Sequence, residues 1–497
     1  MSNIVSTTAK DGSTVEFNYE NPKSGAMKDV YFAPDKSYVV AFYQKQLDYT
    51  GLSRLEKLVG NYREQIFESE GGDYWKDIFC WPEKIVEYDG KTGIVVPAYQ
   101  PHFFFESIQM QGGEKEGKWF ASAKTYNRHV PAEERGGLNT FLRVCLKLAQ
   151  GVRRLHAAGL AHSDLSYKNC LIDPKSGSAC IIDLDGLVVP GLFPPDVAGT
   201  PDFIAPVVVE TLELPKEKRL LPSRATDQHA LAVLIYQYLF HRHPLRGRKV
   251  WDFEDDNRQE SLEMGKNALF IEHPTNRENA YDDRDPDEVN ALAPWSLVNK
   301  LSYKSMGPEL SELFERAFID GLHNPALRPT ANEWEDALSM TADRFVKCNN
   351  PQCIGKGFIY NNAGHPACPY CDTRLSEPLP FLDYYVANPQ GRFLREKNRR
   401  MVIWHGVRLY QWHADRYVVS NEKTKPEDKE AVAYCVFHNG AWNLVNVNLP
   451  ELKVVYENGS QVDRKIGIGQ KVVLTNGMQM ILKSPPNGRA VTVGFTK

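Results

Sequence analysis

The chain has 497 residues, of which 59 are Lys or Arg and 63 are Asp or Glu, so its formal net charge is −4. This length allows about three domains, and the near balance of charges excludes a general attraction to nucleic acid or to an anionic membrane. The N-terminal residues lack the apolar core of a secretory signal, and no later run is apolar enough to span a bilayer. With nine cysteines in such a chain, we expect a reducing cytoplasmic location.

Alternating apolar residues predict strands near the N-terminus, over residues 14–17, 29–32 and 38–43. Gly25 lies just before the second of these strands, in the position of a loop that covers a nucleotide. Such a loop usually carries three glycines, and here only Gly25 is present, so an ordinary hairpin turn is the alternative.

A Val-Ala pair on a strand is the motif that precedes a lysine holding the α- and β-phosphates of a nucleotide, and such a pair lies on the strand near residue 40. The Val-Ala pair at 40–41 would place it at position 43, which is Tyr43. Lys45 lies two residues further on the same strand face, and we assign it as the phosphate lysine. A solvated surface lysine is the alternative.

A helix is predicted over about 52–68, because apolar residues recur there at helical spacing. Glu64, or in second place Glu56, is the expected ion-pair partner of the lysine, and a surface glutamate is the alternative. Two strands joined by a turn at 89–91 follow, and they lead into a hinge near 97–99. The stretch 110–131 is rich in Gly, Lys and Glu and is predicted to be an exposed insertion.

A predicted helix over 138–158 is followed by the most informative stretch, residues 162–186. Phosphoryl transfer needs a carboxylate that orients the substrate hydroxyl and accepts its proton, and an amide and a second carboxylate that hold Mg²⁺. Asp164 fits the first role, and Asn169 and Asp183 fit the second. The alternative is a strand hairpin with acidic residues at its turns.

The C-terminal side of this stretch continues the pattern. A segment at 199–206 contains Thr200, and a strongly apolar helix is predicted over 223–236 with Asp227 at its start. Thr226 and Asp227 are also ordinary residues for a helix N-terminus. Further helices are expected over 310–322 and 331–345.

Over about residues 14–345 the chain resembles eukaryotic-like protein kinases. More narrowly, it looks like the bacterial kinase of tellurium-resistance-associated operons, which accompanies a von Willebrand-type protein and a metal-dependent protein phosphatase. The resemblance implies an N-lobe over 1–99, a C-lobe over 100–345, ATP and Mg²⁺ as cofactors and a protein substrate. Asp227 would then hydrogen-bond the catalytic-loop backbone, and Thr200 would contact Asp164, as in serine/threonine kinases.

Several residues depart from the family pattern. Ser166 replaces the usual lysine, so Lys168 is expected to stabilise the transferred phosphoryl group. Asp185 replaces the glycine of the metal-binding triplet, and it adds a metal-ligand oxygen or caps a turn. Val207 replaces a glutamate, so Arg328 is expected to use Glu210 instead.

The loop after the metal-binding aspartate is not expected to be a phosphorylation switch. Ser163 stands where an arginine would recognise a loop phosphate, and Thr200 is the sole hydroxyl-bearing residue in 184–206. We therefore expect control by partner binding or by the C-terminal domains.

Four cysteines occur as two short loops about fifteen residues apart: Cys348, Cys353, Cys368 and Cys371. Paired thiolates on tight turns provide the tetrahedral geometry of Zn²⁺, and four sulfur ligands leave no open position for catalysis. We predict a structural zinc ribbon over 346–377, with free buried thiols as the alternative. His365 is a spare possible ligand.

The remaining residues, 378–497, contain short predicted strands, one of them over 417–420, separated by turns such as 439–440 and 476–477, which is typical of a β-sandwich. Residues 440–446 and 467–474 resemble a forkhead-associated domain, a phosphothreonine-reading module. Ser420 and Asn446 occupy plausible places for phosphate contact, but Asn421 stands where a basic residue is expected. We carry over the fold and not the phosphopeptide binding.

The sequence thus predicts an α+β chain: a two-lobed protein-kinase-like fold, a small zinc ribbon and an all-β sandwich. The predicted function is an ATP- and Mg²⁺-dependent protein serine/threonine kinase in bacterial stress or tellurium-resistance-type signalling, whose C-terminal modules dock partners. The alternative is a nucleotide-binding pseudokinase scaffold that regulates a partner phosphatase or von Willebrand-type protein. The reduced glycine loop and the uncertain lysine favour that alternative.

Overall fold

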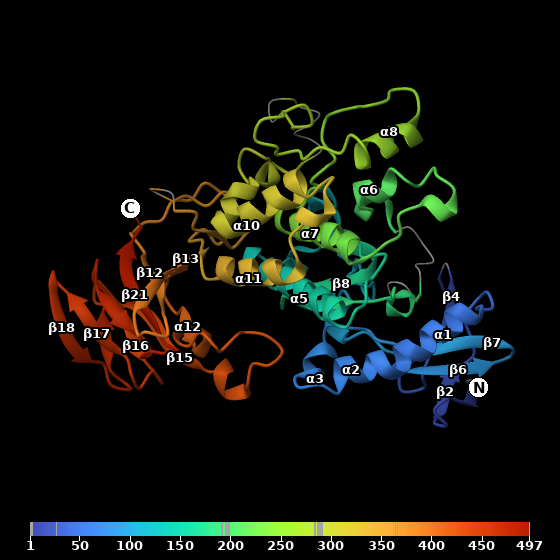
Figure 1. The fold of residues 1–497 in the computed structure, drawn as a ribbon, viewed down its shortest axis with the longest axis horizontal. Coiled ribbons are helices and arrows are strands. Elements are labelled where there is room, and N and C mark those ends of the chain that lie inside the picture. The colour runs from blue at the N-terminus through green and yellow to red at the C-terminus, as the bar shows by residue number, and fades with distance from the viewer. Residues whose placement is uncertain are drawn as a thin grey trace. The chain divides into compact units, whose positions relative to one another are not determined.

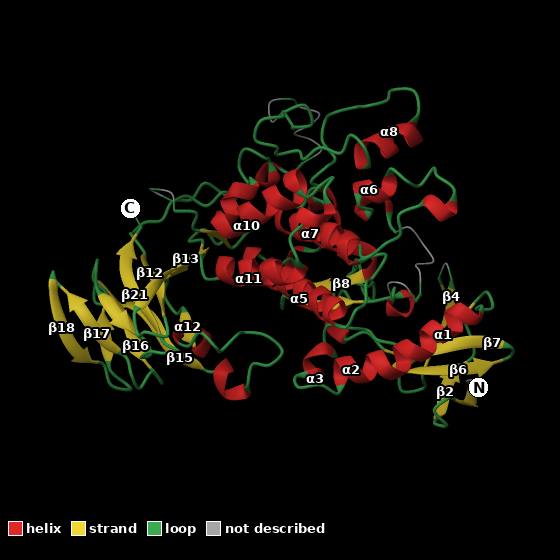
Figure 2. Cartoon of the chain, in the orientation of Figure 1, coloured by secondary structure: helices red, strands yellow, loops and turns green. Residues whose placement is uncertain are grey.

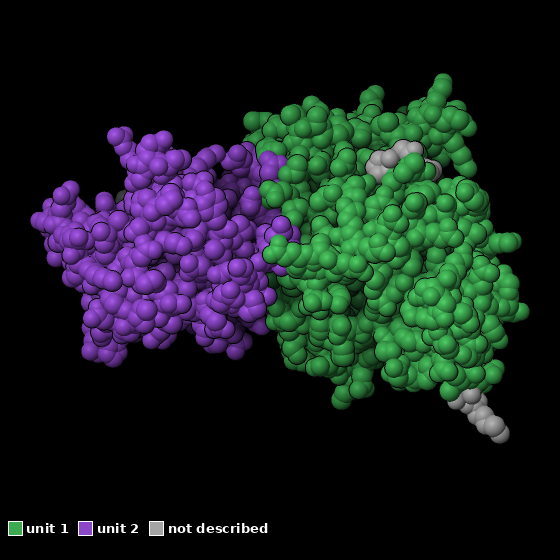
Figure 3. Space-filling model, turned by 60° about the horizontal axis from the view of Figure 1, so that its bottom comes forward, with its two compact units in different colours: residues 1–136, 143–282, 316–332 green, residues 137–142, 283–315, 333–497 purple. Residues whose placement is uncertain are grey.

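The computed structural model describes residues 3–25, 27–189, 192–193, 199–282, 285, 292–362, 364 and 366–496. The chain forms two compact units, coloured separately in Figure 3: residues 1–136, 143–282 and 316–332, and residues 137–142, 283–315 and 333–497. Helices and strands are both abundant (Figure 2), as the α+β prediction requires. The domain limits drawn at 345 and 377 stay a prediction. Among the described residues, no helix combines the length and apolar character needed to cross a bilayer.

The first unit contains a five-stranded antiparallel sheet of order β3-β4-β5-β7-β6, of which β4, β6 and β7 are labelled in Figure 1. Its strands are β3 (Lys23–Ser24), β4 (Lys28–Phe32), β5 (Tyr38–Tyr43), β6 (Lys84–Tyr88) and β7 (Lys91–Pro97). Alternation along β5 sends Val40 and Phe42 to one face and Ala41 and Tyr43 to the other. The hairpin of β1 (Ile4–Thr8) and β2 (Thr14–Asn18) covers the first face.

The second face of this sheet is covered by a helical segment. The segment consists of α1 (Tyr49–Lys57), η1 (Leu58–Tyr62), α2 (Arg63–Phe67) and α3 (Gly72–Trp75). Asp48 caps α1 by accepting the Gly51 N–H at 2.7 Å, and Leu55 packs on the sheet. The helix predicted over 52–68 is therefore present, but it is interrupted at Gly60, whose φ of −91° and ψ of −106° are not helical.

The rest of the first unit is mainly helical. Its further elements, together with α5 (which begins in the second unit), are α4 (Ala123–His129), α5 (Leu138–Ala157), β8 (Cys170–Asp173), β9 (Ser178–Ile181), α6 (Pro206–Val209), α7 (Arg224–Phe240) and α8 (Asp256–Met264). Nearly all of α7 is buried, which agrees with its continuous apolar sequence. The stretch 110–131 is not simply an exposed insertion, because Lys115, Phe120 and Tyr126 are buried. Lys115 is tied to Glu134 and Asp173, which is why this part of the stretch lies inside the fold.

The second unit is dominated by two antiparallel sheets, of order β13-β12-β21-β20-β17-β18 and β14-β15-β16-β19. Their strands are β12 (Pro380–Ala387), β13 (Phe393–Val402), β14 (Arg408–Tyr410), β15 (Ala431–His438), β16 (Ala441–Asn446), β17 (Lys453–Glu457), β18 (Ser460–Lys465), β19 (Lys471–Val473), β20 (Gln479–Ile481) and β21 (Arg489–Phe495). Buried side chains of both sheets, such as Leu382 and Leu444, belong to one hydrophobic core.

Shorter elements complete the second unit. They are α10 (Gly307–Glu315), most of α11 (Ala331–Ala342), α12 (Gln411–Ala414) and a two-stranded sheet of β10 (Phe345–Lys347) and β11 (Gly357–Ile359). One expected strand is wrong: residues 417–420 form a loop. The Thr424 hydroxyl donates to the Val419 carbonyl and accepts the Asn421 N–H, and these local bonds compete with strand pairing.

Candidate active site

Asp227, at the start of α7, fixes the loop between α5 and β8 by a hydrogen bond. Its carboxylate is buried and accepts the backbone N–H of His162 at 2.8 Å. The same oxygen lies 3.0 Å from Nε2 of His156, near the end of α5. The predicted hydrogen bond from the catalytic-loop backbone to Asp227 is therefore present.

The carboxylate of Asp164 is oriented by three donors. Its Oδ1 accepts the backbone N–H of Thr200 at 2.6 Å and the Thr200 hydroxyl at 2.8 Å. Its Oδ2 accepts the side-chain amide of Asn169 at 3.1 Å, and the same amide donates to the Asp164 carbonyl at 2.8 Å. The predicted contact between Asp164 and Thr200 is confirmed. Because the amide nitrogen of Asn169 is engaged, a cation can meet Asn169 only through its amide oxygen.

A cavity of about 550 Å³ lies between the sheet of the first unit and this loop. That volume is in the range of sites for cofactors and small molecules. Its apolar wall includes Val30, Val39, Ala41, Ile94 and Val96, and its polar end is formed by Gly25, Lys28, Asn169, Asp183 and Asp185.

Asp183 follows β9 and lies at this polar end. Its backbone is left-handed, with φ of 60° and ψ of 45°, an uncommon conformation for a residue other than glycine. Strained backbone of this kind often occurs at functional sites, where it aims a side chain. The Asp183 side chain is 52% exposed, so a ligand in the cavity can reach its carboxylate.

The cation at the polar end of the cavity is Lys28, at the start of β4. Its Nζ lies 2.9 Å from Oδ1 of Asp183 and 2.7 and 2.8 Å from the two oxygens of Asp185. In the antiparallel register of β4 and β5, Lys28 is directly opposite Tyr43. The Tyr43 hydroxyl donates to Oδ2 of Asp185. Lys28 therefore brings an ammonium to the same carboxylate that the side chain at position 43 contacts.

Burial and charge act against each other in this cluster. Burial lowers the pKa of Lys28, but the charges of Asp185 and Asp183 outweigh it and hold that pKa above its usual value. Burial raises the pKa of Asp185, but Lys28 outweighs it and keeps that pKa below its usual range. Burial and the Asp185 charge raise the pKa of Tyr43. At neutral pH the cluster thus holds an ammonium, a carboxylate and a neutral phenol.

The structure does not bring the two predicted ATP-positioning residues on the sheet and helix to this site. Lys45 is exposed and lies beyond the end of β5 at Tyr43, so the strand alternation that suggested it has already stopped. Glu64 is exposed on α2, and Glu56 pairs with Lys10 at 2.9 Å. Neither Lys45 nor Glu64 is among the described residues that line the cavity.

Lys168 and Gly25 belong to different parts of the first unit. Lys168 belongs to η5 (Tyr167–Asn169), between the two catalytic-loop residues, and its side chain is exposed. Gly25 forms the turn between β3 and β4, where its N–H donates to the Lys28 carbonyl at 2.9 Å.

In the loop after Asp185, residues 190–191 and 194–198 lie outside the described residues, so the expectation about loop phosphorylation stays a prediction.

The expectation that Arg328 pairs with Glu210 is wrong. Arg328 donates to the carbonyls of Gly321 and Ala225 at 2.8 Å and of Leu322 at 3.0 Å. Glu210 lies 3.7 Å from the His323 ring instead. Burial lowers the pKa of Arg328 to about 10.

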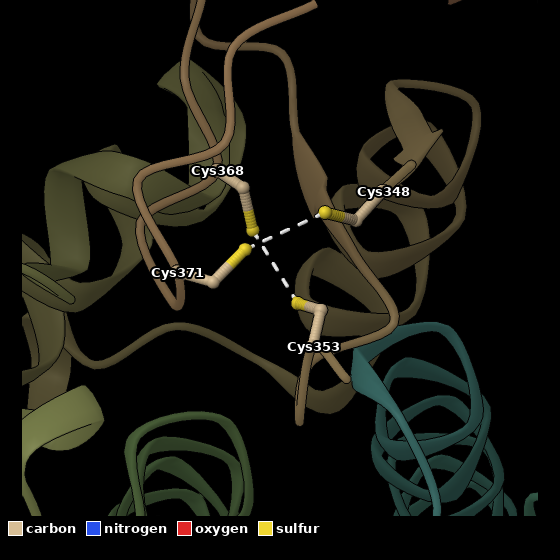
Figure 4. A group of neighbouring side chains, drawn as sticks. All are labelled: Cys348, Cys353, Cys368 and Cys371. Atoms are coloured by element: carbon tan, nitrogen blue, oxygen red, sulfur yellow. Dashed lines mark hydrogen bonds between the residues drawn. The ribbon is translucent and has the colours of Figure 1, made fainter. Parts of the chain in front are cut away.

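The four clustered cysteines converge on one point (Figure 4). Their sulfur atoms all lie within 4.8 Å of one another, and two pairs, Cys348 with Cys371 and Cys353 with Cys368, are 3.6 Å apart. Zn–S bonds of about 2.3 Å in a tetrahedron place sulfurs about 3.8 Å apart, so the spacing fits. His365 lies outside the described residues.

Each of these sulfurs also accepts the backbone N–H of the residue two positions later. The donors are Asn350, Gly355, Tyr370 and Thr373. Such bonds stabilise a thiolate, which is the form that binds a metal. The hydrogen bond from Cys368 lowers the pKa of Cys353 to about 5. The chemistry of this donor set therefore suits Zn²⁺.

In the two-sheet part, Asn446 has a structural task. Its amide nitrogen donates to the carbonyls of Leu449 and Ile466 at 2.9 and 2.8 Å, and its oxygen accepts the Leu449 N–H at 2.7 Å. The side chain is buried, so it fixes the turn after β16 rather than meeting a phosphate. The forkhead-associated-like identity stays a prediction.

Residues 116–334 match the protein kinase domain family. The matched residues include Asp164, Asn169 and Asp183. The chain is 30% identical over 137 residues to the serine/threonine-protein kinase PknD of Chlamydia felis, a match that covers 23% of this chain and 14% of that protein. It is 38% identical over 69 residues to the dual serine/threonine and tyrosine protein kinases of Gallus gallus and Homo sapiens, covering 14% of this chain and 7% of each relative. The chain thus spans only a small part of the length of these relatives.

Proposed function

We propose that the protein is an ATP- and Mg²⁺-dependent protein serine/threonine kinase. The observation that carries the proposal is the convergence of Lys28 and Asp183 at 2.9 Å at the polar end of the cavity, beside the Asp164–Asn169 loop. This convergence supports an active kinase over a scaffold without activity, because it provides a lysine for the phosphates where the sequence left that lysine uncertain. The match of residues 116–334 to the kinase domain supports the same activity.

Each residue has a role that its geometry supports. Asp164 would orient the hydroxyl of the substrate and accept its proton, with its carboxylate held by Thr200. Asn169 and Asp183 would hold Mg²⁺, which when bound neutralises the charge of the phosphates. Lys28, rather than Lys45, would contact the phosphates, and the exposed Lys168 would stabilise the transferred phosphoryl group. Gly25 would cover the phosphates from the β3–β4 turn.

Thr200 supports serine or threonine as the acceptor. Its hydroxyl contacts both Asp164 at 2.8 Å and Ser166 at 3.3 Å, which closes the space beside the carboxylate. A short aliphatic hydroxyl fits this arrangement better than the longer phenol of tyrosine.

We also propose that the four cysteines hold one structural Zn²⁺, and that the zinc and two-sheet parts dock a protein partner. The resemblance to the tellurium-resistance kinases suggests a phosphatase or a von Willebrand-type protein as that partner, in bacterial stress signalling. A cytoplasmic location fits this proposal, because free thiols persist there.

The activity is tested by incubating the full chain with Mg²⁺ and γ-labelled ATP, alone and with a generic protein substrate. Phosphoamino-acid analysis should find label on serine or threonine. An Asp73→Asn variant is the control, since its side chain is 92% exposed and is not among the described residues that line the cavity. Label on tyrosine alone would contradict the acceptor assignment, and no transfer under any divalent cation would contradict the kinase proposal.

A further inference from the structure

Helix α1 supplies no carboxylate to Lys28. The sequence of α1 contains a single acid, Glu56, which is exposed and bonds with Lys10. The buried residues of α1 are Arg54 and Leu55, a cation and an apolar residue. In protein kinases the phosphate lysine requires a glutamate from the corresponding helix. Here an anion from another element must hold Lys28.

Asp185 is placed to be that anion. Its side chain is 9% exposed, whereas that of Asp183 is 52% exposed. Both oxygens of Asp185 bond to Lys28, at 2.7 and 2.8 Å, whereas Asp183 offers one oxygen at 2.9 Å. Hydrogen bonds between an ammonium and a carboxylate are charge-assisted, and they are shorter and stronger than bonds between neutral groups. Asp185 is therefore the buried ion-pair partner of Lys28, and Asp183 is the carboxylate that a ligand in the cavity can reach.

Tyr43 fixes the orientation of Asp185. It lies opposite Lys28 in the sheet register, and its ring centroid is 5.5 Å from the Lys28 ammonium. Its hydroxyl donates to the second oxygen of Asp185, an oxygen that Lys28 also contacts. With both oxygens engaged in this way, Asp185 is poorly suited to ligate a metal ion.

We propose that Asp185 is a positioning residue that holds Lys28 for the phosphates of ATP, oriented by Tyr43, in the role that a helix glutamate has in other kinases. The inference rests on the proposed kinase function. When ATP binds, Lys28 exchanges its bond to Asp183 for phosphate oxygens and keeps its bonds to Asp185. Because Asp185 follows β9 and is not on α1, a displacement of α1 leaves Lys28 in place.

Single and double variants of the full chain test whether Asp185 acts through Lys28. Mg·ATP affinity is measured by calorimetry, and kcat/KM for ATP is measured with labelled ATP. Asp185→Asn and Lys28→Met should each lower kcat/KM by about 10- to 100-fold, because each removes a charged hydrogen bond. The double variant should be no worse than Lys28→Met alone, since Asp185 acts through Lys28. Equal losses from Asp185→Asn in the presence and absence of Lys28 would contradict the proposal.

A second set of variants moves the lysine from position 28 to position 43, because the hydroxyl of Tyr43 already reaches Asp185. Adding Tyr43→Lys to Lys28→Met should regain at least about tenfold in kcat/KM, and adding Asp185→Asn should remove that gain. Tyr43→Phe, which keeps the ring, should cost about 3- to 10-fold. The proposal would be overturned if the folded variant with both Lys28→Met and Tyr43→Lys regained no phosphotransfer. It would also be overturned if Tyr43→Phe kept the wild-type kcat/KM for ATP.

The outcomes separate this inference from the proposed function. Thermal melts of every variant establish that it folds, and Asp73→Asn should match wild type in all readouts. A wild-type protein that neither binds nor uses ATP refutes the kinase function. An active wild type with an equally active Asp185→Asn refutes the positioning role alone. A raised Mg²⁺ requirement in Asp185→Asn without a change in ATP affinity identifies Asp185 as a metal ligand and overturns the proposal.

Discussion

Lys28 and Tyr43 lie directly opposite each other on antiparallel strands β4 and β5, and both side chains bond to the same carboxylate, that of Asp185. Tyr43 occupies the position where the strand sequence led us to expect a lysine. The ammonium has moved to the neighbouring strand, but it still reaches the polar end of the nucleotide-sized cavity. The change of strand therefore preserves the charge at the site.

Substitution of the two candidate phosphate lysines, Lys28 and Lys45, should have different effects on ATP use. Lys28→Met should reduce Mg·ATP affinity and phosphotransfer by at least tenfold, because the contact between a partly buried cation and the phosphates is lost. Lys45→Met should stay within about twofold of wild type, because Lys45 is exposed beyond β5. The measurement is kcat/KM for ATP with both purified variants. A large loss in Lys45→Met with little loss in Lys28→Met would return the assignment to Lys45.

The Thr200 hydroxyl is expected to hold Asp164 rather than to react. Thr200→Val keeps the shape and the backbone N–H bond but removes the hydroxyl donor, so phosphotransfer should fall by about 3- to 10-fold while ATP affinity is kept. Thr200→Ser, which retains the hydroxyl, is the matched control and should stay close to wild type. A valine variant as active as the serine variant would show that the bond has no role in transfer.

The cysteine cluster predicts one zinc ion per chain, measured by elemental analysis of protein purified under reducing conditions. Cys368→Ser should lose the metal and lower the melting temperature of the second unit, because a structural zinc supplies folding free energy. Cys435→Ala is the control, since Cys435 is buried in the same unit but outside the cluster. Metal-free wild-type protein, or a Cys368→Ser variant with full zinc content, would contradict the assignment.

The buried ion cluster of Lys115, Glu134 and Asp173 makes a prediction about stability. The Lys115 ammonium lies 3.0 Å from Glu134 and 3.1 Å from Asp173. Lys115→Met would leave two carboxylates buried without their cation, which should cost about 3–5 kcal/mol of unfolding free energy at pH 7.5. Lys118→Met, on an exposed pair with Glu116, should cost about 1 kcal/mol or less.

The pH dependence of that loss follows from the two carboxylates. Burial raises the pKa of Glu134, but backbone N–H groups and Lys115 outweigh it, so the pKa lies below its usual value; Asp173 behaves alike, with Ser176 and Lys115 lowering its pKa. Their contribution to wild-type stability is thus present at neutral pH and lost as the pH falls below about 4. Without Lys115 both pKa values rise, so the cost of Lys115→Met should shrink between pH 7.5 and pH 5. Urea unfolding at both pH values measures this, and a constant cost would contradict it.

The parts of the site that the sequence identifies are those close together in the chain. Asp164, Asn169 and Asp183 belong to one loop and the hairpin after it, so their spacing alone indicates that they meet. Lys28 could not be found in this way, because its role depends on the register between β4 and β5 and on where β5 ends. The signal that was available is Tyr43 at the lysine position with a lysine at the start of the preceding strand. Local hydrogen bonds, such as those of Thr424, likewise prevented the strand expected at 417–420.

We expect Asp164 to perform phosphotransfer in a site that binds ATP through other residues. The most direct test measures Mg·ATP affinity and transfer of the γ-phosphate in wild type and in Asp164→Asn. Asp164→Asn should bind Mg·ATP with nearly wild-type affinity and lose transfer by at least about 100-fold, because orientation of the hydroxyl and proton acceptance are lost while the phosphate contacts remain. Full transfer by Asp164→Asn, or ATP binding by a wild type that transfers nothing, would contradict this expectation.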